Sequence, residues 1–340
     1  MHEKSDRRSF LNKSLLGAVG VGAACSHEEN ILLAAMKDGA ARPASPPKPE
    51  VDPKSMPTGK IGNIAISRLF LGGNLIGGWA HSRDLLYVSR LFKAYNTDEK
   101  VFETLELAEM CGVNTVLIDP VSQNTVEQYK KERGGKIQTM VCMHPSSDEA
   151  KVKEQCKYLV DKGATLLYTH GEVTDHQTMT QRVDVLGKAL DAMKAQGVPA
   201  GIGSHSLETP MACEKNKLPV DYFVKTFHMD RYWSASPSQK REEWCWYKPQ
   251  NGDHDSYRDN IWCLDAEKTQ NFMAQVSKPW VAFKVMAAGA IHPGTAFPWA
   301  YRNGADFIVA GMFDFQLEQD VKLAIEAVRK IDKRARPWCA

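Results

Sequence analysis

Eight short apolar runs, separated by segments with helical periodicity, constrain the fold of this 340-residue chain more than any other feature. The runs are Arg68–Gly72, Asn114–Asp119, Ile137–Met143, Thr165–Thr169, Ala200–Ser204, Tyr222–Phe227, Val281–Met286 and Phe307–Ala310. Amphipathic segments accompany them at 101–111, 150–160, 181–195 and 317–331. Strands that alternate with helices are typical of a parallel sheet with crossover helices. Eight such units predict an α/β fold, a closed (β/α)8 TIM barrel.

Two additions to the barrel are expected. Residues 60–67 precede the first strand and have the pattern of a small β-hairpin. A long loop, residues 229–262, follows the sixth strand. Loops of this length are uncommon in compact domains and often serve as lids or binding walls.

The first residues of the chain resemble a bacterial twin-arginine export signal. Arg7 and Arg8 precede Phe10-Leu11 and a weakly apolar run at 15–24, which is too short to span a bilayer as a permanent helix. This predicts a signal peptide at 1–25 that engages the export machinery, and a periplasmic or exported protein. The alternative is the basic start of an ordinary amphipathic helix. A lipid on Cys25 is less favoured than simple cleavage, because Gly22 stands where lipoprotein signals usually have leucine.

Composition restricts the domain boundaries, the partners and the disulfide bonds that can be expected. Residues 26–58 are rich in Pro and Ala and predict a partly disordered linker, which leaves 59–335 for the barrel domain. A formal net charge of +2 gives no electrostatic reason to expect a nucleic-acid partner. The eight cysteines form no CxxC motif. We expect Cys111, Cys142 and Cys156 in the core, while Cys245 and Cys263 could pair in an oxidising compartment.

Several segments resemble the aldo/keto reductase superfamily of barrels. They are "SRLFLGG" at 67–73, "GVNTVLIDP" at 112–120, "LLYTHGE" at 166–172 and "NGADFIVAGMFDFQLEQDVKLA" at 303–324. The resemblance implies catalytic roles for Asp119 and His170, and NADP as cofactor. The chain departs from the family pattern because no tyrosine occurs between Asp119 and Tyr129, and because His144 follows the third strand in place of the catalytic lysine. The segments that grip the cofactor phosphates are not recognisable at 285–293. Hydride transfer from NADP is therefore the less favoured hypothesis.

Polar side chains follow most of the predicted strands. In chain order they are Asn74, Asp119, His144, His170 with Glu172, His205, His228 and Lys284. The carboxyl ends of barrel strands meet at one face, where barrel enzymes carry their active sites. Any one of these histidines alone would more often be a hydrogen-bonded scaffold residue, but four at successive strand ends predict a shared site. Imidazole and carboxylate groups are good ligands for zinc or manganese. The candidate ligands of such a divalent-metal site are His170, Glu172, His205 and His228.

Lys284 is the predicted proton acceptor. Strand alternation places Val281, Phe283 and Val285 toward the helices and Ala282, Lys284 and Met286 toward the barrel axis. A desolvated lysine amine there can act as a base or form a Schiff base with a carbonyl substrate. The alternative is a structural ion pair with Asp119 or Glu172. His144 is a second candidate for moving the proton, with Asp119 setting the charge of both.

Two segments offer walls for a substrate. The long loop mixes aromatic and polar residues that suit a sugar ring, among them Trp233, Trp246 and His254. The segment after the first strand, 77–95, adds His81 and Arg83. The loop aromatics could instead form their own small core or a homo-oligomer contact.

Three functions remain open on these grounds. The favoured one is an exported enzyme that transfers a proton beside the carbonyl of a small, carbohydrate-derived substrate, as an isomerase, epimerase or lyase does. The second is a reductase with tightly bound NADP. The third is a non-catalytic periplasmic sugar-binding protein.

Overall fold

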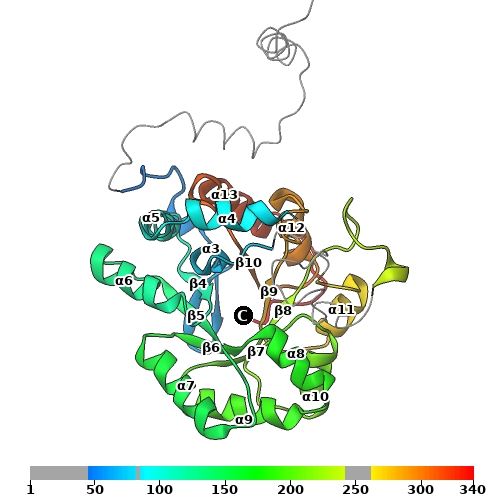
Figure 1. The fold of residues 1–340 in the computed structure, drawn as a ribbon. Helices are drawn as coiled ribbons and strands as arrows, with labels where there is room; N and C mark the ends of the chain where they lie inside the picture. The colour runs from blue at the N-terminus through cyan, green and yellow to red at the C-terminus, as the bar shows by residue number, and fades with distance from the viewer. Residues whose placement is uncertain (1–44, 82–84, 242–261) are drawn as a thin grey trace, which may run out of the picture. The chain divides into compact units, whose positions relative to one another are not determined.

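In the computed structural model, which describes residues 45–81, 85–241 and 262–340, eight parallel strands close into a barrel. Figure 1 looks along the barrel, with the strands at the centre and the helices around them. The strands are β3 (Leu69–Gly72), β4 (Thr115–Ile118), β5 (Gln138–Met143), β6 (Leu166–Thr169), β7 (Ala200–Ser204), β8 (Tyr222–Thr226), β9 (Trp280–Phe283) and β10 (Phe307–Ala310). They pair in chain order, and β10 pairs with β3 to close the barrel. The antiparallel hairpin of β1 (Thr58–Ile61) and β2 (Ile64–Ser67) precedes it. The predicted TIM barrel with an N-terminal hairpin is confirmed.

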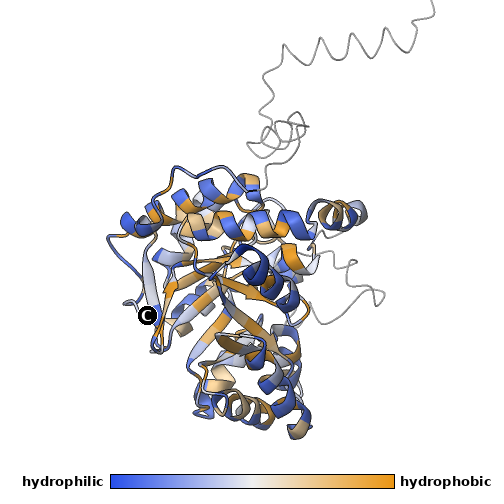
Figure 2. Ribbon diagram, turned by 90° about the vertical axis from the view of Figure 1, so that its left-hand side faces the viewer, coloured by the Kyte–Doolittle hydropathy of each residue, from blue (hydrophilic) through white to orange (hydrophobic). Residues whose placement is uncertain are grey.

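The helices follow the strands as expected for crossover connections. They are α3 (Asn74–Gly77), α4 (Leu86–Tyr95), α5 (Asp98–Met110), α6 (Gln123–Arg133), α7 (Glu149–Asp161), α8 (Gly171–Met179), α9 (Val183–Lys194), α10 (Glu208–Lys215), α11 (Ala266–Met273), α12 (Pro293–Arg302) and α13 (Asp314–Arg329). Side-chain caps explain where several begin. The Thr97 hydroxyl accepts a hydrogen bond from Lys100 N at the start of α5, and Asp148 accepts one from Lys151 N at the start of α7. Figure 2 shows apolar residues concentrated on the strands and a mixed pattern on the helices.

Alternate residues of each strand enter two separate cores. An outer core between strands and helices contains Leu167 and Ile202, whereas an inner core fills the barrel with Phe70, Tyr168 and Phe307. Glycines make room for the inner aromatic rings. A Cβ atom at Gly201 would lie 2.4 Å from the ring of Tyr222, and one at Gly203 would lie 2.1 Å from the carbonyl oxygen of Thr169.

The amino-terminal end of the barrel is closed by the hairpin. Ile61 and Ile66 are fully buried and belong to the inner core. A short 3-10 helix, η1 (Pro53–Ser55), precedes the hairpin. Val51 and Met56 flank it and are buried in the outer core, so the folded part begins before the predicted boundary at residue 59. Pro and Ala content predicted a linker here, but two apolar side chains are enough to anchor it.

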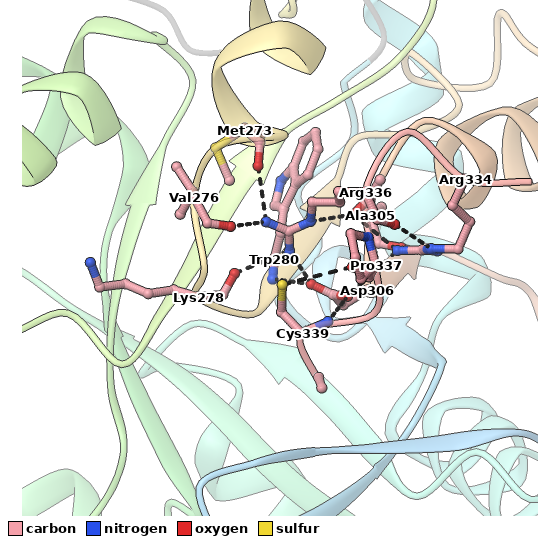
Figure 3. A network of polar contacts seen from close by, with 12 residues as sticks. Met273, Val276, Lys278, Trp280, Ala305, Asp306, Arg334, Arg336, Pro337 and Cys339 are labelled. Carbon is pink, nitrogen blue, oxygen red and sulfur yellow. Dashed lines mark hydrogen bonds and ion pairs between the residues drawn. The ribbon is translucent and has the colours of Figure 1, made fainter.

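The last residues of the chain pack against the same end of the barrel, beyond the predicted limit at 335. Asp306 lies at the centre of their polar contacts, which Figure 3 shows in close view. Its carboxylate accepts hydrogen bonds from Arg336, from Trp280 N at 2.9 Å and from Cys339 N at 2.9 Å. Arg334 adds a contact 3.5 Å long. One buried carboxylate thus joins β9, β10 and the carboxyl-terminal segment.

The sixth barrel strand, β8, is followed by the expected long connection to α11. It contains a 3-10 helix, η2 (Ser238–Lys240), and residues 242–261 lie outside the described part of the chain. Cys245 falls there, and Cys263 is a buried free thiol with Sγ 3.7 Å from Thr269 Oγ1. Cys111, Cys142 and Cys156 are buried, as predicted. The predicted signal peptide, with Cys25, also lies outside the described residues. Within the described residues no helix is both long and apolar enough to cross a membrane.

Candidate functional site

Four polar residues continue the inner phase of successive strands at the carboxyl end of the barrel. Ile118 and Met143 pack in the outer core, so the residues that follow them, Asp119 and His144, turn toward the axis. The same alternation directs His170, after β6, and His205, after β7. The predicted gathering of strand-end side chains is present. The rings of His144 and His170 are 5.2 Å apart.

His170 is a neutral imidazole at the centre of this group. Burial, followed by the neighbouring His144, His205 and Lys284, lowers its pKa to about 3. Its Nδ1 atom is buried and makes no hydrogen bond with any residue in the described ranges. Its backbone caps α8, because its carbonyl oxygen accepts from Thr174 N at 2.9 Å and Thr174 Oγ1 at 2.7 Å. The backbone is therefore fixed, and Nδ1 is a buried polar atom whose hydrogen-bonding capacity is not used by the described residues.

Asp119, the residue that the family resemblance singled out, directly follows β4. Its Oδ1 accepts from Ser122 N at 2.7 Å, and its Oδ2 accepts from the indole nitrogen of Trp79. Its negative charge favours the protonated forms of His144 and His170. Burial dominates at both rings and lowers the pKa of His144 as well. Asp119 thus opposes the effect of burial on His144 without setting its charge, and it is not among the charges that act on Lys284.

Lys284 reaches the same mouth by a route that strand alternation did not predict. Val281 and Phe283 face the inner core, while Ala282 and Met286 pack in the outer one, so the predicted phase of β9 was wrong. The strand ends at Phe283, and Lys284 adopts a left-handed backbone with φ of 56°. This conformation is unfavourable for a residue with a side chain and is often retained at functional sites. The left-handed turn carries the lysine into the mouth.

The amine of Lys284 lies in a largely apolar setting. Its Nζ is 2.7 Å from Nε2 of His81 and 4.0 Å from the centre of the Trp262 ring. Burial lowers the pKa of Lys284 to about 7, and the negative charge of Glu172 opposes that change. The residues predicted separately as base and as substrate contact, Lys284 and His81, are thus brought together. Glu172 acts on the lysine amine rather than within a metal site.

His205 is held by a carboxylate that sequence analysis did not identify. Asp175 of α8 is fully buried, and its Oδ2 lies 3.0 Å from Nδ1 of His205. The same oxygen accepts from His205 N at 2.8 Å. The imidazole contacts the rings of Trp262 and Phe283, with centroids at 5.0 and 5.4 Å. An acidic residue one helical turn inside a helix carries no sequence signal, which is why Asp175 was missed.

His228 has a structural role that does not fit the predicted metal site. Its ring is fully buried, and Nε2 accepts hydrogen bonds from Trp262 N at 3.1 Å and Cys263 N at 3.0 Å. Its Nδ1 donates to Met229 O at 2.9 Å. Both ring nitrogens are therefore engaged. Across the described ranges, no three His, Cys, Asp or Glu side chains are arranged to hold a metal ion. These residues do not fit zinc or manganese.

The structure describes one of the other four residues that were predicted to contact a substrate. Arg83, Trp246 and His254 lie outside the described residues. Trp233 is described and its side chain is 87% exposed. A cavity of about 850 Å³ lies at the opposite end of the barrel, lined by residues that include Lys60, Pro199 and Lys278. It is remote from the histidines, so converging polar groups, not cavity size, define the candidate site.

The barrel of this chain is similar to barrels in solved structures of other proteins. Two structures of a protein from Pseudomonas aeruginosa that is named as an aldo-keto reductase superpose with a TM-score of 0.51. The shared fold is a (β/α)8 barrel. The match covers 80% of this chain and 94% or 95% of the two neighbours, at 14% sequence identity, which is evidence for the fold alone. No protein-family model and no curated protein sequence matches the chain.

The NADP implied by this resemblance does not fit the corresponding segment. Residues 285–295 after β9 contain no lysine or arginine to contact a phosphate. At the start of α12, Gly294 N already donates to Nδ1 of His292 at 3.1 Å. A helix N-terminus that serves an anion needs such N–H groups unoccupied.

Proposed function

We propose that the protein is an enzyme that transfers a proton beside the carbonyl group of a small polar molecule, with Lys284 as the base. The observation that carries this proposal is the position of the Lys284 amine, 2.7 Å from His81 and against the Trp262 ring at the barrel mouth. A neutral amine is a base, and apolar surroundings favour the neutral amine over the ammonium form.

The neutral imidazoles supply the complementary function. Removing a proton from the carbon beside a carbonyl leaves its electron pair to form an enolate, whose oxygen bears negative charge. His144 and His170 have lowered pKa values, so both are neutral near pH 7 and each can donate one ring N–H to that oxygen. Donors held in place before reaction stabilise such an oxyanion without reorganisation.

Residues of the site can hold the proton that leaves the carbon and return it to the substrate. Lys284 Nζ takes the proton from carbon and becomes an ammonium group, and His81 at 2.7 Å is placed to share it. Returning the proton to the opposite face of the same carbon gives epimerisation. Returning it to the former carbonyl carbon gives isomerisation when the hydroxyl proton of the first carbon passes to the former carbonyl oxygen. Glu172 stabilises the ammonium form of Lys284, so the amine is not too weak a base to accept the proton.

The same amine can alternatively form a covalent Schiff base. In that route Nζ attacks the carbonyl carbon, water leaves, and the iminium accepts the electron pair in place of the oxygen. Reduction by borohydride would then attach the substrate to Lys284 permanently, whereas a base mechanism leaves the enzyme unlabelled. Mass spectrometry of the peptide containing Lys284 distinguishes the two routes.

A carbohydrate-derived substrate is the favoured class. Sugars have a carbonyl carbon beside a C–H group, and their rings combine apolar faces with hydroxyl groups. Trp79, 43% exposed, lies against Asp119, and Trp262 lies against Lys284 and His205, so aromatic faces alternate with polar groups in the site.

The decisive test uses exchange with solvent and needs no knowledge of the product. The purified protein is incubated in deuterium oxide with a panel of small sugars and hydroxyketones, and loss of the C–H signal beside the carbonyl is followed by NMR. We expect exchange with the wild type and loss of about 10²-fold or more in Lys284→Met. Lys278→Met is the matched control at the opposite end of the barrel. Equal exchange in both variants would remove Lys284 from the reaction.

Export is proposed for this enzyme on the twin-arginine pattern of residues 1–25. A fusion of residues 1–44 to a reporter that is active only after export in folded form tests it. Replacing Arg7 and Arg8 by lysine should abolish export, and replacing Lys13 should not. Export that is unaffected by the arginine replacements would contradict the proposal.

A further inference from the structure

We infer that Asp175 is a positioning residue that holds His205 in one tautomer, so that Nε2 of His205 accepts a proton from a hydroxyl group beside the substrate carbonyl. This inference rests on the proposed function for its chemical role, but not for its geometry. If His205 acts in this way, the substrate is an α-hydroxy carbonyl compound, which is a narrower class than carbonyl compounds in general.

The first observation is the number of donors that converge on Asp175. Its carboxylate accepts from the backbone of His205 at 2.8 Å and of Ser206 at 3.3 Å, and from the Thr209 hydroxyl at 2.9 Å. Hydrogen bonds from neutral donors favour the charged carboxylate over the protonated acid. Burial acts in the opposite direction and raises the pKa of Asp175 to about 7. Above about pH 7 the carboxylate form predominates, so the ring nitrogen that faces Asp175 meets an acceptor.

The second observation is how firmly the imidazole is fixed. His205 is only 8% exposed, and its ring packs against those of Trp262 and Phe283. Gly171 provides the space, because a Cβ atom there would lie 3.0 Å from Cε1 of His205. The ring cannot turn over without displacing these neighbours. Nδ1 and Cε1 thus face α8, with Nδ1 against Asp175.

The chemical consequence follows from the tautomer. Burial and the positive charges of Lys284 and Lys225 lower the pKa of His205, so its ring is neutral and carries one N–H. If Nδ1 donates that hydrogen to Asp175, Nε2 has a lone pair and is a base. A carboxylate that orients a histidine in this way increases its usefulness as a general base without touching the substrate.

Lys284 and His205 lie at the same end of the barrel, so the two bases can act on one substrate. Lys284 removes the proton from carbon, and Nε2 of His205 removes the proton from the adjacent hydroxyl oxygen. The electron pair from the C–H bond gives an enediolate with its negative charge on the former carbonyl oxygen. Nε2 of His205 passes the hydroxyl proton to that oxygen, and Lys284 returns its proton to the former carbonyl carbon, which completes an isomerisation with no net change in atoms or redox state. A substrate without the adjacent hydroxyl would use Lys284 alone.

The experiment is nitrogen-15 NMR of histidine-labelled full-length protein at pH 7.5, with the His205 signals assigned by their loss in His205→Gln. We expect a protonated Nδ1 and an unprotonated Nε2 in the wild type, and a mixture of tautomers in Asp175→Asn. Thr209→Val, which removes another donor to the same carboxylate, should keep the wild-type tautomer. A protonated Nε2 in the wild type would overturn the inference even if no variant folds, and an unchanged tautomer in Asp175→Asn would overturn it as well.

A second measurement separates this inference from the proposed function. In the deuterium-exchange assay, Asp175→Asn should lose about 10²-fold with an α-hydroxy ketone and little with the matching deoxy ketone. Equal losses with both substrates would indicate a purely structural Asp175. Absence of exchange in the wild type would contradict the proposed function while leaving the tautomer result intact.

Discussion

The Nζ atom of Lys284 lies 2.7 Å from Nε2 of His81, although 203 residues separate the two in the chain. β9 and its left-handed turn supply the lysine, and the segment after β3 supplies the histidine. These strands flank β10 in the closed barrel, so barrel closure brings the two residues together.

The pH dependence of proton exchange should follow the lysine amine. With a pKa of about 7, Lys284 is protonated at lower pH and cannot accept a proton. We expect kcat/KM to fall about tenfold per pH unit below 7 and to level off above it. The measurement is the exchange rate between pH 5 and 9. A rate that is flat across this range would exclude a base with this pKa.

The buried charges around Asp306 should make a large contribution to stability. Asp306→Asn keeps the shape but leaves Arg336 and Arg334 without their carboxylate. The expected loss is about 3–5 kcal/mol in the free energy of unfolding. Asp161→Asn removes the exposed partner of Lys157 and should cost less than about 1 kcal/mol. Denaturant unfolding of the two variants measures the difference, and similar losses would contradict the assignment.

The interior glycines should be sterically required. Gly203→Ala places a Cβ atom 2.1 Å from Thr169 O, a backbone atom that cannot move without disturbing β6. We expect a loss of about 1–3 kcal/mol or more. Gly187→Ala in α9 is the control, since its Cβ would lie 3.5 Å from Leu218 and the helix should gain about 0.5–1 kcal/mol. A neutral Gly203→Ala would show that the barrel interior has more room than these contacts indicate.

His228 should behave as a scaffold residue and not as a metal ligand. His228→Ala leaves the N–H groups of Trp262 and Cys263 without their acceptor, at about 1–3 kcal/mol for each buried donor. Treatment of the wild type with a chelator should leave its melting temperature unchanged. A melting temperature that falls with chelation and recovers with zinc or manganese would restore the metal hypothesis.

Strand ends were predictable from sequence, but the contacts between them were not. Asp119, His144, His170 and His205 each follow a recognisable apolar run, and their inward direction follows from alternation. The phase of β9 failed because Trp280, Val281, Ala282 and Phe283 are all apolar, so the run has no polar face to orient it. The left-handed backbone of Lys284 also has no signature in a residue that is not glycine.

Contacts between residues that are distant in sequence were also not predicted. Asp175 and His205 lie 30 residues apart and meet because α8 packs on β7, a relation that no local pattern records. The histidine count at strand ends likewise suggested metal binding. That count could not show that the backbone N–H groups of Trp262 and Cys263 donate hydrogen bonds to Nε2 of His228.

The central claim, that Lys284 presents a neutral amine at the barrel mouth, is tested most directly by titrating that amine. Protein labelled with carbon-13 at the Cε of lysine is followed by NMR from pH 5 to 11, with the Lys284 signal assigned by its loss in Lys284→Met. We predict one resonance that titrates near pH 7 and is absent from the variant. A Lys284 signal that titrates above pH 9, with the exposed lysines, would contradict the account.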